Sequence, residues 1–444
     1  MKKLLFPGFL ITLLLSSNLL TAQEVKIKFS EYDLDNGLHV ILHKDQTIPI
    51  VSVSVMYHVG SKNEDPNLTG FAHFFEHLMF EGTENIERGE YSKYVEKAGG
   101  TLNANTTNDR TYYYEILPSN QLKLGLWLES ERMLHARVDS IGIATQKKVV
   151  SEEKKQRYDN TPYGTLLMEM MKRAYTVHPY HWTTIGDMDQ LLKAKDEDFV
   201  NFYKTFYVPN NAVLVVAGDI DIDSTKQWIN NYFGDIPRGT KKIFRPTVVE
   251  PPQKAEIRDT VYDNIQLPLI AQGYHIPAMN TPDYYAVMML SSLLSDGQSS
   301  RLYKELVDKK QMAVHIGSSP LPFRDPSLAL IYALPNMGTD PKVLEDAIDA
   351  EIDKVKNNLI SEEEYKKLKN QFETDYVSSN ERLASRAENL ATDYTYFKNA
   401  DLINHELDKI KSVSREDIKR VANKYFNKNN RVVLYYLPKS EKKN

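Results

Sequence analysis

The sequence contains no cysteine and no lysine- or arginine-rich block. A chain without cysteine forms no disulfide, so its stability must come from a hydrophobic core or from a bound metal. The net charge of −5 is too small to favour binding to nucleic acid or a polybasic contact with a membrane. The 444 residues are 41% hydrophobic and 26% charged, which is typical of a globular protein and sufficient for two or three domains.

A long apolar run occurs only at the N-terminus, where two lysines precede Leu4–Leu20. Residues 1–22 are therefore predicted to be a signal peptide that is cleaved after Ala22. The alternative is a retained membrane anchor, which Pro7 and Gly8 disfavour because they interrupt an already short span. No cysteine follows the run, which excludes a lipid-anchored lipoprotein. We expect a periplasmic or secreted protein of a bacterial envelope, without a membrane span after cleavage.

Short strand patterns alternate with helical patterns along the rest of the chain. The pair Asn36-Gly37 separates two apolar stretches and predicts a hairpin. Alternating apolar residues predict a strand over Val51–Tyr57, and the polar segment Gly60–Gly70 is typical of a loop. The other expected elements are amphipathic helices over Leu122–Met133 and within Gly142–Ala174, and a buried strand over Ala212–Ala217.

Two segments far apart in the chain share one pattern, which indicates an internal duplication. Asp198–Val216 and Asp417–Tyr435 each run from an aspartate through a helical segment, an aromatic pair and Asn-Asn to an apolar strand, at a constant offset of 219 residues. The proline-rich segment Arg245–Lys254 is the best linker. We predict an α+β protein of two similar duplicated domains, each a mainly antiparallel sheet packed with helices. The expected division is 1–22 signal peptide, 23–244 first domain, 245–254 linker and 255–444 second domain.

The segment GFAHFFEHLMFEGT contains His73, Glu76 and His77. On a helix the two histidines share one face, so both imidazoles can bind one ion, and Zn²⁺ accepts imidazole nitrogen. Glu76 projects near that face and can serve as general base for an attacking water. The alternative is that these are ordinary helix residues with a solvated glutamate. The order His-x-x-Glu-His is the inverted zincin motif.

A catalytic zinc takes three protein ligands, so a third ligand must come from elsewhere in the chain. The adjacent residues Glu152 and Glu153, on a predicted helix, are the candidates. Neighbouring helix residues point in different directions, so at most one of the two faces the histidines. Sequence spacing by itself does not choose between them.

The motif and its flanks resemble the insulinase/pitrilysin family of zinc peptidases, in particular the short-chain branch that includes mitochondrial processing peptidase and bacterial relatives. The resemblance rests on YHVGSKNEDPNLTGFAHFFEHLMFEGT and GGTLNANTTNDRTYYYE, and it covers essentially the whole mature chain. The family places its third ligand 76 positions after the second histidine, which here selects Glu153. The resemblance implies that His73, His77 and Glu153 bind one Zn²⁺ per chain and that Glu76 activates water for peptide hydrolysis.

The resemblance also implies how a substrate is held. In the family two halves close like a shell around a peptide, and a chain of this length supplies one half of that clamshell chamber. An extended or unfolded peptide lies as an added strand beside the segment that matches Thr101–Asn105, held by main-chain hydrogen bonds. Asn103 and Ala104 are the expected substrate-binding residues. The alternative for Asn103 is a turn or strand-end residue.

The second half departs from the family at two positions. Family members that act alone, and the zinc-free partners of paired members, carry an arginine and a tyrosine that bind substrate and stabilise the oxyanion. The equivalent positions here are Val307 and Val314, which donate no side-chain hydrogen bond. Arg301 is interpreted as a structural residue. We expect a homologous subunit to supply both groups in a heterodimer; a homodimer is less favoured, and reduced activity is the other alternative.

Smaller features complete the prediction. Gln146 stands where many relatives have a second glutamate, which would change the hydrogen bonds around the metal. His178 and His181 are interpreted as loop residues, because Pro179 disfavours their convergence on a helix. The predicted function is that of a zinc-dependent endopeptidase. The alternatives are a non-catalytic structural subunit of a larger complex and a subunit that captures peptides without cleaving them.

Overall fold

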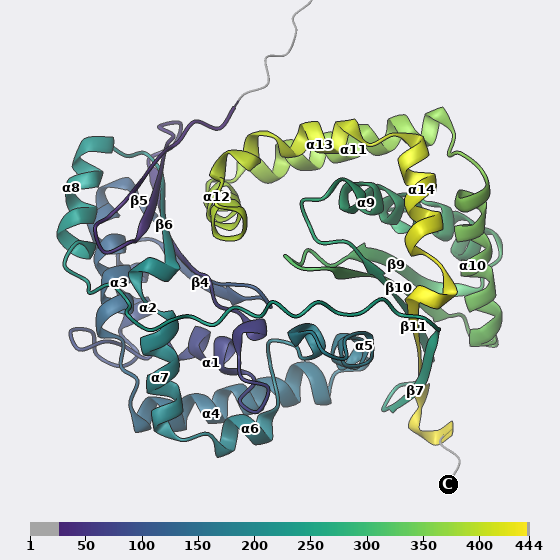
Figure 1. The fold of residues 1–444 in the computed structure, drawn as a ribbon, viewed down its shortest axis with the longest axis horizontal. Helices are drawn as coiled ribbons and strands as arrows, with labels where there is room; N and C mark the ends of the chain where they lie inside the picture. Colours follow the sequence, from purple (N-terminus) through teal and green to yellow (C-terminus); the bar gives the residue numbers. More distant parts are fainter. Residues whose placement is uncertain (1–25, 442–444) are drawn as a thin grey trace, which may run out of the picture.

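The computed structural model describes residues 26–441, so the predicted signal peptide, residues 1–22, lies outside the described part of the chain. Two units, each a sheet packed with helices, lie side by side and are joined by one extended segment (Figure 1). Residues 237–256 form this connection and contain neither helix nor strand. Within residues 26–441, no helix combines the length and the apolar character that crossing a bilayer requires.

The two sheets have the same strand topology. The first sheet has the order β1-β2-β6-β3-β5-β4, and the second has the order β7-β11-β8-β10-β9. Each contains one parallel pair, β2 with β6 and β11 with β7, and its other pairs are antiparallel. Apart from the extra strand β1, the sheets correspond strand for strand, as the predicted duplication requires. The strands are β1 (Ser30–Asp33), β2 (His39–Lys44), β3 (Ile50–Tyr57), β4 (Thr101–Thr106), β5 (Thr111–Pro118), β6 (Ala212–Gly218), β7 (Ile257–Asp263), β8 (Leu269–Ile276), β9 (Ala313–Pro320), β10 (Ser327–Pro335) and β11 (Arg431–Pro438).

The helices cover both sheets and connect their strands. The predicted hairpin and the strand patterns of β3 and β6 are present. The helical stretch predicted within Gly142–Ala174 is interrupted: a π-helical turn follows α4 over Lys155–Asp159, and residues 160–165, which include Pro162 and Gly164, contain no helix. The helices are α1 (Phe71–Leu78), α2 (Tyr91–Lys97), α3 (Leu122–His135), α4 (Ser140–Lys154), α5 (Leu166–Ala174), α6 (Met188–Lys193), α7 (Asp196–Phe206), α8 (Ile222–Phe233), α9 (Pro282–Ser295), α10 (Pro341–Asn357), α11 (Glu362–Glu381), α12 (Leu383–Phe397), α13 (Glu406–Ser412) and α14 (Arg415–Tyr425).

The two halves exchange helices across their junction. Helix α12, from the second half, packs against β2, β3 and β6 of the first sheet, where Leu390 contacts a cluster that includes Val215 (Figure 1). Helix α5, from the first half, packs against β8 and β11 of the second sheet, where Met170 joins Leu434. Each half therefore completes the hydrophobic core of the other, and fully burying one such side chain stabilises the fold by about 1.5–3 kcal/mol.

Buried ion pairs also join the halves. Lys62, which is almost fully buried, contacts Asp109 of the first half and lies 3.0 Å from Asp325 of the second. Arg110 lies 2.5 Å from Glu388 on α12. Because a buried charge without a partner is costly, these contacts favour one relative placement of the two units.

Candidate metal centre

Helix α1 has an apolar face and a polar face. The rings of Phe71, Phe74 and Phe75 are buried and pack against α7, with Phe71 stacked 4.6 Å from Phe199 and Phe75 stacked 5.1 Å from Phe202. The helical period then places His73, Glu76 and His77 away from this aromatic cluster. The imidazole centroids of the two histidines are 4.9 Å apart.

Both ends of α1 are fixed by buried polar groups. At the N-terminus, the Glu64 carboxylate accepts hydrogen bonds from the backbone N–H groups of Gly70, at 2.9 Å, and Ala72, at 2.8 Å. Gly70 has φ 91°, and an added Cβ would lie 2.8 Å from the Ile185 carbonyl oxygen, so this position requires glycine. At the C-terminus, the buried Arg132 donates to the Met79 carbonyl at 3.1 Å. These contacts set the position of the histidine pair.

Glu153 reaches the histidines from α4, which packs against α1. Its Oε2 lies 3.5 Å from His73 Nε2 and 3.1 Å from His77 Nε2. Within residues 26–441, these three residues are the one group of histidine, cysteine or acidic side chains whose ligand atoms all lie within 4.8 Å of one another. Glu152 points elsewhere: it is 59% exposed and pairs with Lys155 at 2.7 Å. The geometry therefore brings Glu153, and not Glu152, to the histidine pair.

The protonation of these groups fits a divalent cation. Burial, reinforced by the neighbouring His77, lowers the pKa of His73 to about 4, which leaves the imidazole neutral and able to ligate. Hydrogen bonding to His77 lowers the pKa of Glu153, which favours the carboxylate. Glu153 Oε2 is buried and lies against the Nε2 atoms of both histidines. Two imidazole nitrogens and one carboxylate oxygen are a donor set that Zn²⁺ accepts in catalytic sites.

Glu76 lies on α1, which also packs against β4. Burial raises the pKa of Glu76, while the positive charge of Arg110 opposes this shift. Arg157, which sequence reasoning missed, lies 2.8 Å from Glu153 Oε1 and one helical turn after it. The i,i+4 spacing of an acidic and a basic residue was the signal that could have identified this contact.

The predicted substrate-binding segment forms strand β4, at the edge of the first sheet. Asn103 is exposed, and its side-chain oxygen accepts a hydrogen bond from the Ala104 N–H at 2.9 Å. The outer edge of β4 has no further strand in this sheet. It therefore offers main-chain groups to which an extended peptide can add.

The second half contains no arginine or tyrosine at the two positions of the family pattern. Val307 packs against the core of the second sheet, and Val314 on β9 is 53% exposed. Arg301 donates two hydrogen bonds to Glu364, at 2.8 and 2.9 Å. This paired contact with the first turn of α11 agrees with a structural role for Arg301.

The other residues singled out in the sequence lie outside the histidine–glutamate group. The Gln146 side chain donates to Glu81 at 2.6 Å, a contact that a second glutamate would replace with charge repulsion. His178 accepts a hydrogen bond from the Tyr180 N–H and lies 3.4 Å from Asp325. His181 Nδ1 lies 2.6 Å from the Tyr175 carbonyl oxygen. The two histidines occupy a short 3₁₀ turn and its cap, as their loop interpretation expects.

Comparison with known proteins assigns the family. A profile described as insulinase (peptidase family M16) matches residues 39–187, which contain the whole histidine–glutamate group, and one described as peptidase M16 inactive domain matches residues 193–372. The protein named zinc protease PqqE of Helicobacter pylori is 32% identical over 420 residues, covering 94% of each chain. This chain belongs to the insulinase family of peptidases. An uncharacterized zinc protease of Rickettsia felis is 25% identical, covering 90% of this chain and 96% of the relative.

Solved structures of this peptidase family have the same fold. The crystal structure of a protease from Helicobacter pylori has a TM-score of 0.88 and 32% identity, covering 93% of this chain and all of that one. A peptidase M16 inactive domain from Pseudomonas fluorescens has a TM-score of 0.83 at 17% identity, covering 93% and 98% of the chains. The periplasmic protease PqqL of Escherichia coli has a TM-score of 0.76 at 18% identity; the match covers 92% of this chain but 47% of that one.

Proposed function

We propose that this chain is a zinc-dependent endopeptidase that hydrolyses extended or unfolded peptides. The observation that carries the proposal is the approach of His73, His77 and Glu153 from two helices to within ligand distance of one another. Glu76, one residue before His77, supplies the carboxyl group that proton transfer needs. Relatives named zinc proteases support the same chemistry.

In this proposal His73, His77 and Glu153 hold one Zn²⁺ per chain, which when bound polarises the scissile carbonyl and lowers the pKa of a water. Glu76 takes a proton from the attacking water and returns it to the nitrogen of the leaving amine. Arg157 holds Glu153 through Oε1, so that Oε2 stays directed at the imidazoles. The metal-binding and proton-transfer roles thus belong to side chains of α1 and α4, whose packing orients them.

A peptide substrate would add as a strand to the free edge of β4. Its carbonyl oxygen would accept the hydrogen bond that Ala104 N–H now donates to Asn103, and the released Asn103 amide would bond to the peptide backbone. Binding through main-chain groups selects extended peptides with little preference for sequence. This is why we assign unfolded peptides, and not folded proteins, as the substrate class.

A homologous subunit bearing the arginine and tyrosine would complete the site in a heterodimer. Val307 and Val314 leave this chain without those donors, and the match to PqqL covers about half of that protein. We assign residues 23–244 to the zinc-binding domain, 245–254 to the linker and 255–444 to the second domain, in a chain exported to the periplasm or secreted. The purified chain alone should cleave peptides weakly, and full activity as a homodimer would contradict the heterodimer.

A non-catalytic structural or peptide-binding subunit is the second candidate function. The match of residues 193–372 to a peptidase M16 inactive domain and the two valines favour it. A subunit without catalysis would have no need for Glu76 together with the three metal-binding candidates. The two functions therefore predict different effects of replacing Glu76: a peptidase loses cleavage activity, whereas a non-catalytic subunit has none to lose.

The deciding experiment compares Glu76→Gln with the wild-type protein and with Glu84→Gln. Glu84 is a matched control because its side chain is 72% exposed and pairs with His135 outside the metal centre. We expect Glu76→Gln to keep its zinc and to lose at least about a hundredfold in cleavage of an unfolded peptide, while Glu84→Gln keeps both. A chelator should abolish cleavage by the wild-type protein. An active Glu76→Gln variant would refute the assignment, and a zinc-loaded wild-type protein without cleavage would support the binding subunit.

A further inference from the structure

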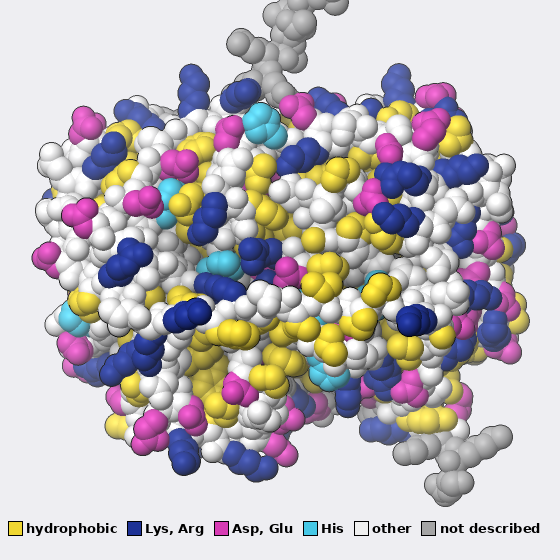
Figure 2. All heavy atoms as spheres, in the orientation of Figure 1, with side chains coloured by type: hydrophobic (Ala, Val, Ile, Leu, Met, Phe, Trp, Pro, Cys, Tyr) yellow, Lys and Arg dark blue, Asp and Glu magenta, His cyan; other side chains and the backbone are white. Residues whose placement is uncertain are grey.

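A cavity of about 330 Å³ lies at the junction of the two halves. It is formed by the first half, the connecting segment and the end of α12. We call it the junction cavity, and its lining includes His58, Asn211, Arg245, Tyr394 and Lys398. In Figure 2, basic side chains and a histidine gather left of the centre of the drawn face, near the extended segment of Figure 1. No residue of the metal centre lines this cavity.

Among the residues that the structure describes, Arg245 and Lys398 of the junction cavity have no acidic partner. Arg245 donates to the His58 carbonyl and to the Asn211 side chain, both neutral groups. The Lys398 Nζ lies 4.8 Å from the Tyr394 ring centroid. Within residues 26–441, neither cation has a carboxylate in ion-pair contact.

Acidic groups near the cavity do not neutralise it. Asp33 is the one acidic residue of the lining; its side chain is 66% exposed, and its carboxylate lies 2.8 Å from His39 Nδ1. A further cation, Arg324, is close enough to Arg245 and Lys398 to affect their pKa values, and its Nε donates to the Tyr396 carbonyl. Two cations, Arg245 and Lys398, thus line the cavity with one exposed carboxylate, and Arg324 adds positive charge nearby.

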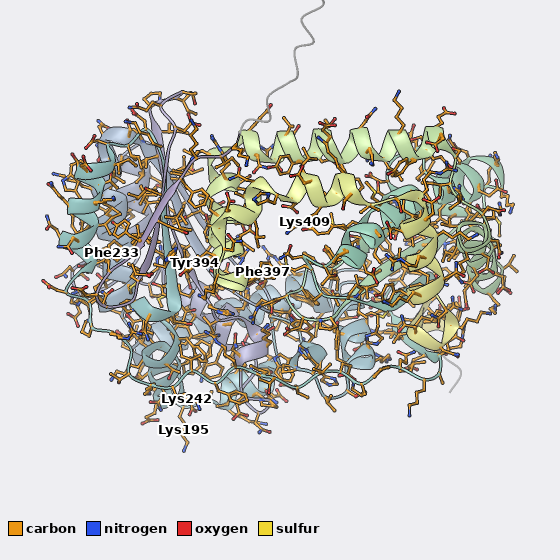
Figure 3. All side chains as sticks on the ribbon, turned by 45° about the horizontal axis from the view of Figure 1, so that its top comes forward. Lys195, Phe233, Lys242, Tyr394, Phe397 and Lys409 are labelled. Atoms are coloured by element: carbon orange, nitrogen blue, oxygen red, sulfur yellow. The ribbon has the colours of Figure 1, made fainter. Side chains whose placement is uncertain are left out.

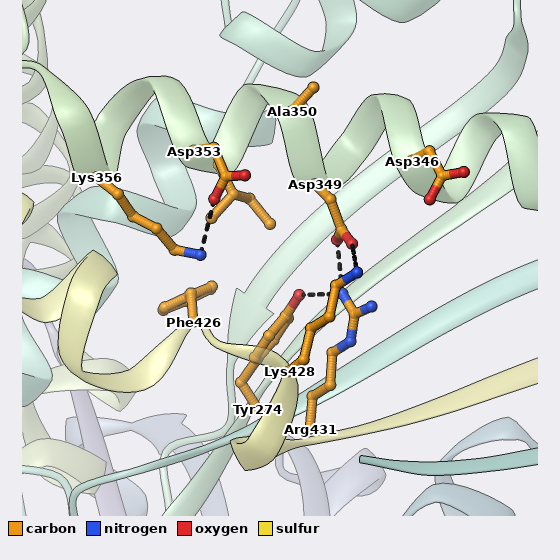
Figure 4. A pocket seen from close by; sticks show the side chains of 10 residues that line it. Tyr274, Asp346, Asp349, Ala350, Asp353, Lys356, Phe426, Lys428 and Arg431 are labelled. Carbon is orange, nitrogen blue, oxygen red and sulfur yellow. Dashed lines mark hydrogen bonds and ion pairs between the residues drawn. The ribbon is translucent and has the colours of Figure 1, made fainter. Parts of the chain in front are cut away.

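A second cavity of the same chain contains cations that are paired with carboxylates. In the cavity of Figure 4, Arg431 lies 2.6 Å from Asp349, and Lys356 lies 3.0 Å from Asp353. A buried cation without a counter-charge is costly, so a folded chain normally provides one. In the junction cavity Lys398 is exposed, but Arg245 is half-buried and has only neutral hydrogen-bond partners among residues 26–441. This points to a counter-charge for Arg245 that comes from outside the chain.

A buried histidine supports this view. The Nε2 atom of His58 is buried and has no hydrogen-bond partner in the described part of the chain. Burial, reinforced by the charges of Arg245 and Arg324, lowers the pKa of His58 to about 2, so the ring is neutral. Burial, reinforced by the charge of Arg324, lowers the pKa of Arg245 to about 10. A bound anion would relieve the repulsion among these cations. The neutral His58 ring can carry its one proton on Nε2, and this N–H can donate a hydrogen bond to an oxygen of the anion.

We propose that the junction cavity binds a small oxyanion of the phosphate class, with Arg245 and Lys398 as its charged donors. Guanidinium and ammonium groups together are the usual protein ligands for phosphate oxygens. Lys398 caps the C-terminus of α12 in the second half, and Arg245 belongs to the connecting segment. The anion therefore bridges the end of α12 and the connecting segment, and it stabilises their relative placement.

The test is calorimetric titration of the full-length protein with inorganic phosphate, in 50 mM and 200 mM sodium chloride. We expect one site per chain with a dissociation constant of about 1 mM or lower, weaker at the higher salt concentration. Lys398→Gln and Arg245→Gln should each weaken binding at least about tenfold. Lys242→Gln is the matched control, because Lys242 is exposed and lies at the edge of the molecule, away from Tyr394 (Figure 3).

Three outcomes decide the proposal. Loss of phosphate binding in Lys398→Gln, with normal binding in Lys242→Gln, supports the proposal. The Lys398→Gln variant keeps the hydrogen bonds of Arg245 to the His58 carbonyl and the Asn211 side chain, which Arg245→Gln removes. Equal binding by the wild-type protein and both cavity variants would place the anion elsewhere, for example at a metal, and would overturn it. A titration with acetate distinguishes the source of the oxygens: acetate binding as tight as phosphate would overturn the phosphate assignment in favour of a carboxylate. No step requires peptide cleavage, so failure here leaves the proposed peptidase function untouched.

Discussion

Replacing Arg132 with methionine should destabilise the first half by leaving two carboxyl groups buried without a cation. The Arg132 side chain is fully buried, with Nε 3.1 Å from Glu129 and one terminal nitrogen 3.4 Å from Glu115. Both glutamates are also fully buried. Removing one partner of a buried ion pair typically costs about 3–5 kcal/mol, and we expect a loss of that size. The variant also removes the donor to the Met79 carbonyl, which helps to fix α1.

The pH dependence of the variant's stability follows from the buried Glu115 carboxyl group. Burial raises the pKa of Glu115 well above its usual range, and removing Arg132 raises it further. The folded variant then holds a proton that the unfolded chain releases above its ordinary glutamate pKa of about 4.3. The unfolding free energy of Arg132→Met should therefore fall as pH rises from about 4.3 to 7. Adding Glu115→Gln and Glu129→Gln replaces both buried carboxyl groups with amides that cannot ionise, and it should recover about 2 kcal/mol or more.

Urea unfolding at pH 7, followed by far-UV circular dichroism, measures these differences. Arg137→Met is the matched control: its guanidinium lies 3.5 Å from the largely exposed Glu87, so the substitution should cost less than about 1 kcal/mol. The reasoning fails if Arg132→Met costs no more than the control. It fails equally if the triple variant is no more stable than Arg132→Met.

Two further predictions concern the helix that crosses between the halves. Leu390→Ala should cost about 2–5 kcal/mol in urea unfolding, because Leu390 is fully buried where α12 covers the first sheet. A cost below 1 kcal/mol would mean that α12 does not pack there in solution. The second prediction concerns His43, whose Nδ1 lies 2.7 Å from the Lys28 carbonyl oxygen and whose Nε2 lies 2.9 Å from the Arg386 guanidinium. Burial lowers the pKa of His43, so the stability from its neutral form is present above about pH 6.5 and is lost as pH falls below that value. Between pH 7.5 and 5.5, the wild-type protein should lose more unfolding free energy than His43→Gln; an equal loss would contradict the contact.

Local patterns in the sequence were sufficient to predict much of the fold. The hairpin at Asn36-Gly37 and the strands β3 and β6 depend on short-range turn chemistry and alternation, and the duplication follows from a constant sequence offset. The exchange of α5 and α12 between the sheets could not be predicted in this way. It depends on which apolar faces meet in space, for example Leu390 against Val215, and no local pattern carries that information.

The candidate metal centre could likewise be predicted only in part from the sequence. The pair His73 and His77 follows from helical spacing, but residue spacing left Glu152 and Glu153 equivalent, and the choice between them required the family resemblance or the orientation of α4. The junction cavity could not be found in the sequence, because Arg245 and Lys398 lie far apart along the chain and meet only after both halves have packed. Sites within one element are accessible to sequence reasoning, and sites between elements depend on the tertiary fold.

Zinc content, measured by elemental analysis of protein purified without chelator, tests the central proposal most directly. We expect one zinc per chain in the wild-type protein and in Glu152→Gln, whose side chain points to Lys155 and solvent. Glu153→Gln should lose most of its zinc because it removes one of three ligands. A wild-type protein without a transition metal, or an equal loss of zinc from Glu152→Gln and Glu153→Gln, would contradict the account.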